Sequence, residues 1–317
     1  MIVVLAGGVG GSRLLQGVVR VAPPEEVVAL VNTGEDEEFF GLSVSPGSDI
    51  VTYALAGILD EERGWGVRGD TFRWLEAMRR FGHDTWFAIG DRDLATHLYR
   101  TRRLREGTPL SRVAAELAGR LGVRTQILPM SDDRVRTVVE TDASAEGGSA
   151  SGGGALAFQR YLVQRHARDA VRGLRLEGGE RARPAPGVLE ALRTADAIII
   201  APSDPLASID PILALPGVRE ALRARRTRVA AVSPIIAGRS MRPPAAELLA
   251  GLGHEVSALG VARLYQDVAR VFVLDRQDEA LAPQVGELGL APLVTDTVMR
   301  DVAAKESLAR AALDALG

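Results

Sequence analysis

The stretch Met1–Ser12 constrains the fold more than any other part of this 317-residue chain. An apolar run, Ile2–Leu5, leads through Ala6 into a cluster of glycines, and residues at helical spacing follow from Arg13 onward. An apolar strand that ends in glycines and passes directly into a helix is how an α/β fold presents backbone N–H groups to a phosphate. The candidate phosphate-binding residues are Gly7, Gly8, Gly10, Gly11 and Ser12.

The glycine spacing alone identifies no reaction. Glycine is favoured in such a loop because a side chain would keep the backbone away from the anion, and because the turn requires positive φ. The third glycine of the dinucleotide-binding fingerprint is absent, and no Gly-Lys-Ser/Thr follows as in a Walker A loop. A tight strand-to-helix turn without a ligand is the alternative interpretation.

The composition excludes several classes of protein and site. With 46% hydrophobic residues the chain can bury a full core, and we expect one α/β domain over residues 1–317. The net charge of -3 gives no overall field for nucleic acid or an anionic membrane. The lack of cysteine excludes thiolate nucleophiles and cysteine-based zinc sites. No apolar run approaches the roughly 20 residues of a membrane span and no signal-peptide pattern opens the chain, so we expect a cytoplasmic protein.

Continuous apolar strands recur along the chain and predict a parallel sheet. Stretches with helical periodicity separate them, and strands that are apolar at every position are typical of a sheet covered by helices on both faces. The predicted fold class is therefore α/β, with a Rossmann-like, doubly wound, mostly parallel sheet. The predicted strands are Ile2–Leu5, Val27–Val31, Ala197–Ala201, Val229–Val232 and Val271–Leu274.

Residues 46–123 differ in composition and interrupt the alternation of strands and helices. They include most of the aromatic residues, among them Trp65, Trp74 and Trp86. We interpret them as a helical insertion over the carboxyl edge of the sheet, where ligands bind in open α/β sheets. The predicted helices of the insertion are Ile50–Leu59, Thr71–Phe81, Asp93–Leu104 and Leu110–Leu121.

A hairpin is predicted in the middle of the chain. Arg134–Thr141 alternates like a strand and Ala155–Val163 like its partner. Residues 143–154, rich in Gly, Ser and Ala, are expected to form a flexible tip between them. Further on, Thr297–Leu316 has the pattern of an amphipathic helix.

Polar residues follow three predicted strands at the edge that holds the glycine loop. Asn32 follows the second strand, Ser203 and Asp204 follow Ala201, and Ser233 follows the fourth strand. The surroundings of Asn32 are equally typical of a capped turn. Two proline-braced polar segments at one sheet edge, in contrast, are hard to explain by packing alone.

Charged residues of the insertion supply two further candidates. Asp49 precedes the helix predicted from Ile50, where it serves either as a helix cap or as a carboxylate for a hydroxyl, a ring N–H or a metal. Arg92 lies between Asp91 and Asp93, which either fix its guanidinium for a ligand or pair with it at a solvated helix start.

The sequence does not identify metal ligands. Ser131-Asp132-Asp133 favours a cap over a cation site, because paired acidic residues are common at turns. The four histidines have no metal-ligand spacing, and His97, which lies near a candidate site, is interpreted as structural.

Taken in order, these segments resemble the 2-phospho-L-lactate transferase family of coenzyme F420 biosynthesis, which also includes phosphoenolpyruvyl-transferring enzymes of bacteria. The resemblance extends from Gly7 to about Asp275. Its motifs include Gly7-Gly8-Val9-Gly10, Val31-Asn32-Thr33-Gly34-Glu35-Asp36, Ser45-Pro46-Gly47-Ser48-Asp49, Gly90-Asp91-Arg92-Asp93, Leu128-Pro129-Met130-Ser131-Asp132-Asp133, Pro202-Ser203, Val232-Ser233-Pro234 and Tyr265-Gln266-Asp267.

The resemblance implies a Mg²⁺-dependent transfer in which the terminal hydroxyl of the deazaflavin FO attacks the β-phosphorus of a guanosine diphosphate adduct and GMP leaves. The deazaflavin contacts of the family map onto Asp49 and Arg92. Its nucleotide and phosphate site maps onto the glycine loop, Asn32, Ser203 and Ser233. Such chemistry requires positioning and charge neutralisation rather than a covalent nucleophile.

Two departures and two alternatives accompany this resemblance. Asp204 stands where family members often have Asn, which bears on guanine or ribose contacts, and we keep it among the nucleotide-binding candidates. Arg13 and Arg242 stand near positions where lysine is frequent, so the charge is preserved and the geometry changes. A non-catalytic nucleotide-sugar-binding regulator related to gluconeogenesis factor is one alternative. A nicotinamide dehydrogenase is the other, but Asn32 stands where its ribose-binding acid would lie. The sequence leaves open whether the transferred group is lactyl, enolpyruvyl or glyceryl, and we expect a homodimer.

Overall fold

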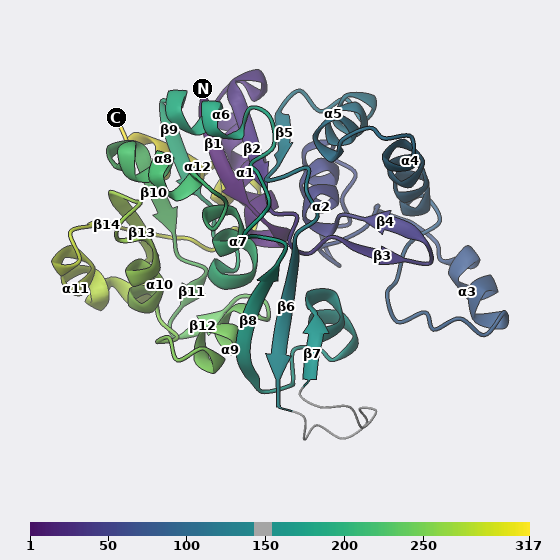
Figure 1. Cartoon of the computed structure of the whole chain (residues 1–317). Helices are drawn as coiled ribbons and strands as arrows, with labels where there is room; N and C mark the ends of the chain where they lie inside the picture. The colour runs from purple at the N-terminus through teal and green to yellow at the C-terminus, as the bar shows by residue number, and fades with distance from the viewer. Residues whose placement is uncertain (143–153) are drawn as a thin grey trace.

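The computed structural model describes residues 1–142 and 154–317, with a seven-stranded parallel sheet at its centre (Figure 1). In spatial order the strands are β14 (Ala291–Thr295), β13 (Val271–Asp275), β10 (Val229–Val232), β9 (Ala197–Ile200), β1 (Ile2–Ala6), β2 (Val27–Val31) and β5 (Gln126–Pro129). The chain extends the sheet from β1 first through β2 and β5, and then from β9 in the opposite direction. The predicted α/β, doubly wound, Rossmann-like fold is confirmed, and its switch point lies between β1 and β9.

The inner strands are apolar throughout because they bury both faces. Along β1, Val3 and Leu5 pack into one apolar layer and Val4 and Ala6 into the other. The helices that contribute to these layers include α1 (Gly8–Val21) and α12 (Val302–Asp314) on the second face, and α6 (Val188–Thr194), α8 (Val218–Ala224), α10 (Ala258–Tyr265) and α11 (Ala282–Glu287) on the first. In the described part of the chain, no helix combines the length and apolarity needed to cross a membrane.

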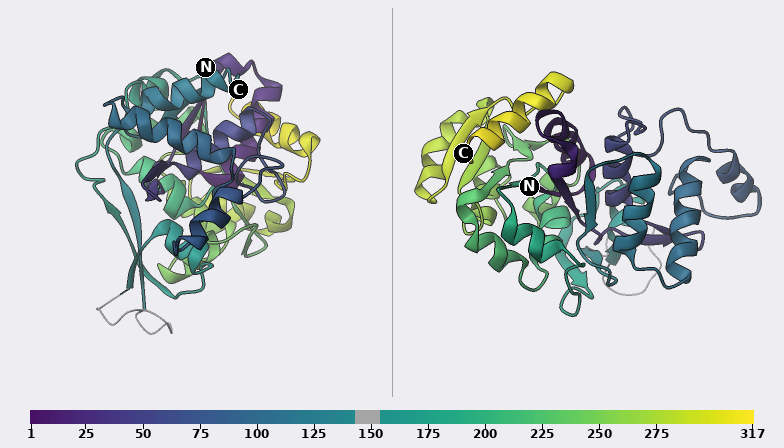
Figure 2. Two further views of the ribbon diagram at one scale, coloured as in Figure 1. Left: turned by 90° about the vertical axis from the view of Figure 1, so that its right-hand side faces the viewer. Right: turned by 90° about the horizontal axis from the view of Figure 1, so that it is seen from above.

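Helices α1 and α12 lie side by side (Figure 2). A Cβ at Gly17 would overlap the backbone carbonyl of Lys305, so glycine permits this close approach. Lys305, the one lysine of the sequence, is only 4% exposed. Its Nζ donates to Gln16 Oε1 at 2.7 Å and to Glu61 Oε2 at 3.0 Å. This contact ties α12 to α1 and to the segment that follows β2.

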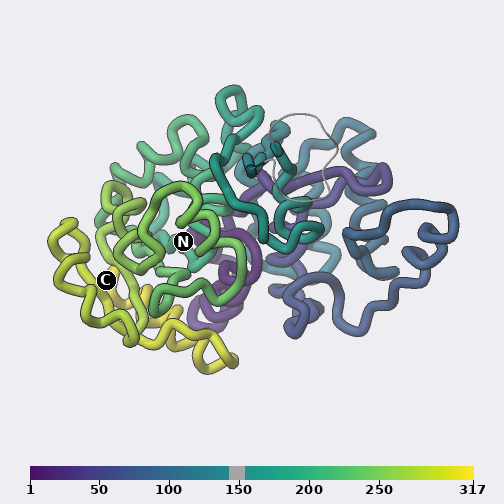
Figure 3. The backbone as a smooth tube through the Cα atoms, turned by 90° about the horizontal axis from the view of Figure 1, so that it is seen from below, coloured from purple at the N-terminus to yellow at the C-terminus, as the bar shows by residue number. Residues whose placement is uncertain are grey.

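The segment between β2 and β5 contains a hairpin as well as helices. The hairpin consists of β3 (Glu37–Phe39) and β4 (Leu42–Val44), and the helices are α2 (Pro46–Leu55), α3 (Arg73–Arg80), α4 (Asp93–Arg105) and α5 (Leu110–Arg120). Val51 of α2 and Ala118 of α5 pack into the same apolar layer as α1. Helix α3 lies far from the sheet, at the right of Figure 1. Seen from below, α1 lies between this segment and the C-terminal half (Figure 3).

A second, three-stranded antiparallel sheet has the order β7-β6-β8, with β6 at Arg136–Thr141, β7 at Gly154–Ala157 and β8 at Val171–Glu177. The predicted pairing of the two hairpin strands is confirmed, but the extension of the second strand to Val163 is wrong. A helical turn over Arg160–Gln164 replaces it, because Phe158 and Tyr161 both turn into one apolar cluster. The predicted flexible tip, residues 143–154, lies outside the described residues except for Gly154, which begins β7.

Two predicted helix starts are also wrong. Helix α2 begins at Pro46 rather than Ile50, since proline is well suited to the first turn of a helix. Helix α12 begins at Val302 rather than Thr297, because the side chain of Asp301 caps it by accepting from the Ala304 N–H at 2.8 Å.

Candidate active site

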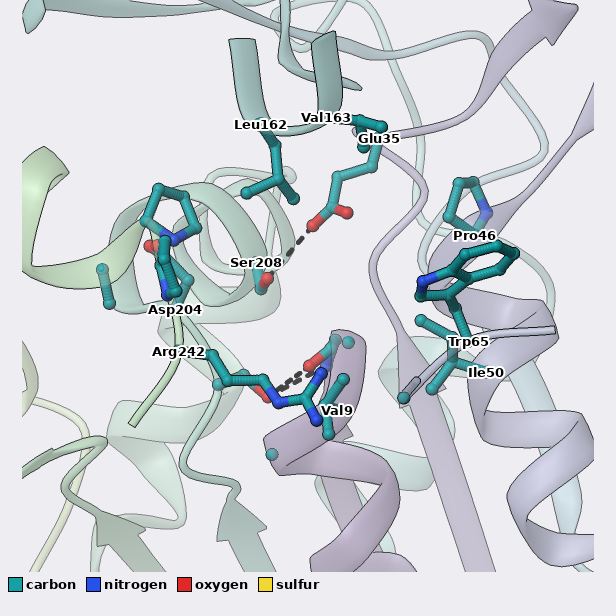
Figure 4. Close-up of a pocket in the computed structure, with 18 of the residues that line it drawn as sticks. Val9, Glu35, Pro46, Ile50, Trp65, Leu162, Val163, Asp204, Ser208 and Arg242 are labelled. Carbon is teal, nitrogen blue, oxygen red and sulfur yellow. Dashed lines mark hydrogen bonds between the residues drawn. The ribbon is translucent and has the colours of Figure 1, made fainter. Parts of the chain in front are cut away.

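A cavity of about 780 Å³ opens at the carboxyl ends of the strands, between the glycine loop and the segment that follows β2 (Figure 4). We call its two sides the loop wall and the insertion wall. The loop wall includes Gly7, Gly8, Val9, Gly10, Arg13, Pro202, Ser203, Asp204, Ser208, Ser233 and Arg242. The insertion wall includes Pro46, Asp49, Ile50, Tyr53, Trp65, Trp86, Phe87, Asp93 and His97.

The glycines bring the start of α1 close to β9. Gly8 has φ of 59°, a conformation that side chains rarely adopt, and a Cβ at Gly10 would overlap the carbonyl oxygen of Pro202. The Gly7 N–H donates to Ser203 Oγ at 3.1 Å, and that hydroxyl donates to the Gly7 carbonyl at 2.7 Å. The first N–H groups of α1 have no partner within the helix, and no acidic residue lies in its first turn. This wall is therefore built to receive an anion.

Three of the predicted phosphate-site residues lie behind this wall and do not line the cavity. Gly11 packs against Ala6, and Ser12 Oγ donates to the Val9 carbonyl at 2.9 Å. Asn32 accepts from the Gly34 N–H at 2.8 Å and donates to the Ala207 carbonyl at 3.0 Å. The structure gives these three residues a supporting position, whereas Gly7, Gly8, Gly10, Ser203, Asp204 and Ser233 face the cavity.

Two arginines of the loop wall have no acidic partner. Among the described residues, neither Arg13 nor Arg242 lies within ion-pair distance of a carboxylate, whereas Arg63 pairs with Asp60 at 2.7 Å. Arg242 lies over Val9 in Figure 4, and its Nη1 donates to the Arg63 carbonyl at 3.0 Å. Partial burial and the nearby Arg13 lower the pKa of Arg242. An anionic ligand would relieve this repulsion.

A buried carboxyl group lies next to the loop wall. Glu35 accepts from Ser208 Oγ at 3.1 Å and from the amides of Asn32 and Gln159 at 3.3 Å (Figure 4). Burial raises its pKa to about 7, against the effect of these donors. Burial likewise raises the pKa of Asp204 to about 6, although Asp204 Oδ1 accepts from the Leu206 and Ala207 N–H groups. Both groups can thus change protonation near neutral pH.

The insertion wall contains a buried polar network around Asp49. Arg100 donates to Asp49 Oδ1, and His97 and Asp93 continue the network to the Tyr53 hydroxyl. Asp49, Arg100 and His97 are 6%, 2% and 2% exposed. Asp49 is therefore not the cap of α2, because it lies inside the first turn with its carboxylate turned to α4. Asp49 is one of the residues that line the cavity, and its buried Oδ2, 3.7 Å from His97 Nδ1, lacks a hydrogen-bond partner in the described part of the chain.

Arg92 differs from its predicted arrangement. It is exposed and does not line the cavity, and the two neighbouring carboxylates have other partners. Asp91 accepts from the Trp74 N–H at 3.0 Å, and Asp93 accepts from the Tyr53 hydroxyl at 2.7 Å. The inference that these two carboxylates fix the Arg92 guanidinium is wrong. Its role in binding a ligand stays a prediction.

Aromatic and apolar side chains complete the insertion wall. Trp65, 37% exposed, faces the cavity beside Pro46 and Ile50 (Figure 4). The Arg63 guanidinium lies 5.3 Å from the centre of the Trp65 ring. Such a surface suits a flat, conjugated ring system.

The cavity fits a Mg²⁺ ion that is shared with a ligand better than an ion held by protein alone. In residues 1–142 and 154–317, no group of three or more His, Asp or Glu is arranged to hold a metal. Mg²⁺ commonly takes only one or two carboxylates and completes its shell with phosphate oxygens and water. Asp204 Oδ2, buried without a hydrogen-bond partner among the described residues, belongs to a cavity residue and is a suitable ligand of that kind. Asp132 is used elsewhere, because it accepts from the Ser111 N–H at 2.6 Å and from the Ser111 hydroxyl at 2.9 Å, at the start of α5.

Several residues of the site were not among the predicted ones. Arg100, Tyr53 and Arg242 carry no local motif, and Glu35 appeared only within the motif that follows β2. His97 was interpreted as structural, yet it lines the cavity. An i, i+4 pair of Asp93 and His97 on one helix was the available signal.

Comparisons with known proteins identify the family. Residues 2–309 match the family model described as "2-phospho-L-lactate transferase CofD". A phosphoenolpyruvate transferase of Streptomyces griseus is 41% identical over 99% of this chain and 97% of its own, and a 2-phospho-L-lactate transferase of Methanosarcina acetivorans is 39% identical over 97% and 96%. A crystal structure of a UPF0052 family member from Bacillus halodurans shares the fold, with a TM-score of 0.64 at 18% identity over 98% of each chain. The chain belongs to the 2-phospho-L-lactate transferase family and is a transferase.

Proposed function

We propose that this transferase acts in coenzyme F420 biosynthesis and moves a phospho-lactyl or phospho-enolpyruvyl group from a guanosine diphosphate adduct to the hydroxyl of the deazaflavin FO, releasing GMP. One observation carries the proposal. A single cavity has unpaired cations and helix N–H groups on its loop wall, and an unpartnered carboxylate oxygen beside aromatic rings on its insertion wall. These are complementary to a diphosphate and to a flat polar ring, respectively.

The loop wall would bind the donor. A diphosphate at the start of α1 would accept from the free N–H groups of the helix, and Arg13 and Arg242 would neutralise its charge. Ser203 holds the glycine loop in place through Gly7. Asp204 and Ser233, at the ends of neighbouring strands, lie where the nucleoside would extend.

The insertion wall would bind the acceptor. Trp65 offers a face for the deazaflavin ring, and Asp49 Oδ2 offers an acceptor for its polar hydrogens. Arg92 precedes the cavity residue Asp93 and would contact the ligand at the rim.

The chemistry requires alignment more than covalent participation. The FO hydroxyl oxygen loses its proton to water and forms a bond to the β-phosphorus, while the bond from that phosphorus to the bridging oxygen breaks, so GMP leaves with the bridging oxygen. Residues of the loop wall hold the phosphates in line and counter the spreading negative charge. Bound Mg²⁺ would supply further charge neutralisation, with Asp204 as a candidate protein ligand.

Mass spectrometry of the products tests the proposal. Purified protein is incubated with FO, Mg²⁺ and the lactyl, enolpyruvyl or glyceryl guanosine adduct, and we expect a phosphodiester of FO together with GMP from at least one of them. Excess chelator should abolish the reaction. Binding of nucleotide without binding of FO would favour the regulator instead, and equal turnover in chelator would remove Mg²⁺ from the mechanism.

A substitution at Asp49 tests the acceptor site. Asp49→Asn preserves shape but removes the charge, so FO affinity measured by fluorescence should fall about tenfold. GDP affinity should not change, because the substitution leaves the loop wall intact. Unchanged FO affinity would remove Asp49 from the site. The homodimer remains a prediction for measurement of mass in solution.

A further inference from the structure

We propose that Arg100 is the positioning residue of the acceptor site, and that the His97 ring keeps Arg100 in place. Together they would aim one oxygen of Asp49 into the cavity. The inference rests on the proposed function, since it explains how the FO-binding carboxylate is oriented.

The contacts divide the Asp49 carboxylate into two unequal oxygens. Arg100, on α4, donates through Nη2 to Asp49 Oδ1, on α2. The other terminal nitrogen of Arg100 lies 3.3 Å from the Ser43 carbonyl oxygen and 3.1 Å from His97 Nδ1. Asp49 Oδ2 lies 3.7 Å from His97 Nδ1 and has no hydrogen-bond partner among the described residues. The network therefore satisfies one oxygen and leaves the other able to accept a hydrogen bond.

His97 lies between Arg100 and Asp93. A guanidinium only donates, so in this contact His97 Nδ1 accepts from Arg100. On the other side of the ring, Nε2 lies 3.2 Å from Asp93 Oδ1. Asp93 is oriented in turn by the Tyr53 hydroxyl, which donates to it at 2.7 Å. The His97 ring therefore fills the space beside Arg100 and supports it.

Stability alone is a poor explanation for this network. Taking the charges of Asp49 and Arg100 out of water costs free energy that their attraction does not reliably recover, and apolar residues of similar volume often stabilise a protein more. What the network provides in addition is a carboxylate that presents a defined oxygen at the cavity wall. Orientation of the ligand-binding group is the function that this arrangement serves.

A double-mutant cycle tests the inference through FO fluorescence titration of Arg100→Met, Asp49→Asn and the double variant. Arg100→Met should weaken FO binding about tenfold, as Asp49→Asn does, and should have almost no further effect when Asp49 is already Asn. GDP affinity serves as the check on folding. Arg103→Met is the matched control, because Arg103 is also on α4 and ion-paired, to Glu116, but outside the cavity.

A pair of His97 variants keeps the test decisive if Arg100→Met does not fold. His97→Gln retains an acceptor for Arg100 and a donor for Asp93, so it should preserve FO affinity, whereas His97→Leu should lose about tenfold. Additive losses in the cycle, or equal losses in both His97 variants, would overturn the inference while leaving the proposed function intact. Wild-type protein that does not bind FO would overturn the proposed function and this inference together.

Discussion

The two walls of the cavity treat their charges in opposite ways. On the loop wall, Arg13 and Arg242 have no carboxylate partner among the described residues, and the start of α1 presents free N–H groups. On the insertion wall, Arg100 is paired with Asp49, whose Oδ2 lacks a hydrogen-bond partner among the described residues. The loop wall therefore favours a strongly anionic ligand, whereas the buried charges around Asp49 are already balanced by neighbouring side chains.

The largest effect is expected where the loop wall touches the sheet. Gly10→Ala places a Cβ against the Pro202 carbonyl, so we expect a loss of about 1–3 kcal/mol of unfolding free energy together with loss of GDP binding. Chemical denaturation and GDP titration measure the two effects. The matched control is Gly119→Ala in α5. A Cβ at Gly119 has no described heavy atom within 4 Å, so this substitution should raise the free energy of unfolding by up to about 1 kcal/mol. Similar behaviour of the two variants would contradict the close approach of the loop to β9.

Removal of a positive charge from the loop wall should have the next largest effect. Arg242→Ala should weaken GDP binding about tenfold and leave the melting temperature unchanged, because the guanidinium has no acidic partner to lose. Arg63→Ala should weaken GDP binding by less than about fivefold, since Asp60 already balances the charge of Arg63. Calorimetric titration distinguishes the two. Equal losses would break the contrast between paired and unpaired cations.

Glu35 places an acidic group beside the cationic loop wall, and its titration tests the contrast between the two walls. Its pKa is raised from 4.5 to about 7, so in this interval the folded protein binds more protons than the unfolded chain, and stability falls as pH rises. Glu35→Gln should therefore match the wild type near pH 4.5 and be the more stable of the two at pH 8, where Glu35 is ionised. In the Glu35→Gln variant, stability should still fall partly as pH rises, because the pKa of Asp36 is also raised, to about 8. Thermal melts against pH test this, with the exposed Glu38→Gln as the control.

The smallest effect is expected for Arg92, at the rim of the insertion wall. Its exposed guanidinium is screened by solvent, so Arg92→Ala should weaken FO binding by about twofold to fivefold. GDP affinity and the melting temperature should stay as in the wild type. A loss as large as that of Asp49→Asn would mean that Arg92 moves into the cavity when FO binds.

Local patterns predicted the parts of the fold that depend on near neighbours. The Ile2–Leu5 run and the glycines specify β1 and the start of α1 within one short stretch, and buried strands such as Val271–Asp275 are apolar at every position. The edge strands were missed. β14 (Ala291–Thr295) has no buried residue, and β5 (Gln126–Pro129) begins exposed, so neither has the continuous apolar signal of an inner strand.

The site was only partly predictable, for a related reason. Asp49 and the glycines were identified, but the partner of Asp49 is Arg100, which is separated from it by a loop, a helix and a second loop. Nothing in the residues around Arg100 distinguishes it from the exposed arginines of the same helix, such as Arg102. Burial alone separates them, and burial depends on how α2 and α4 pack.

The position of Lys305 has a practical consequence for handling the protein. Amine-reactive dyes, biotin esters and lysine cross-linkers need an accessible ammonium group, but this side chain is enclosed between α1 and α12 and engaged by Gln16 and Glu61. Because Lys305 is the one lysine of the sequence, amine reagents should modify no side chain of the folded protein readily. Modification of Lys305 should therefore report when the contact between α1 and α12 opens.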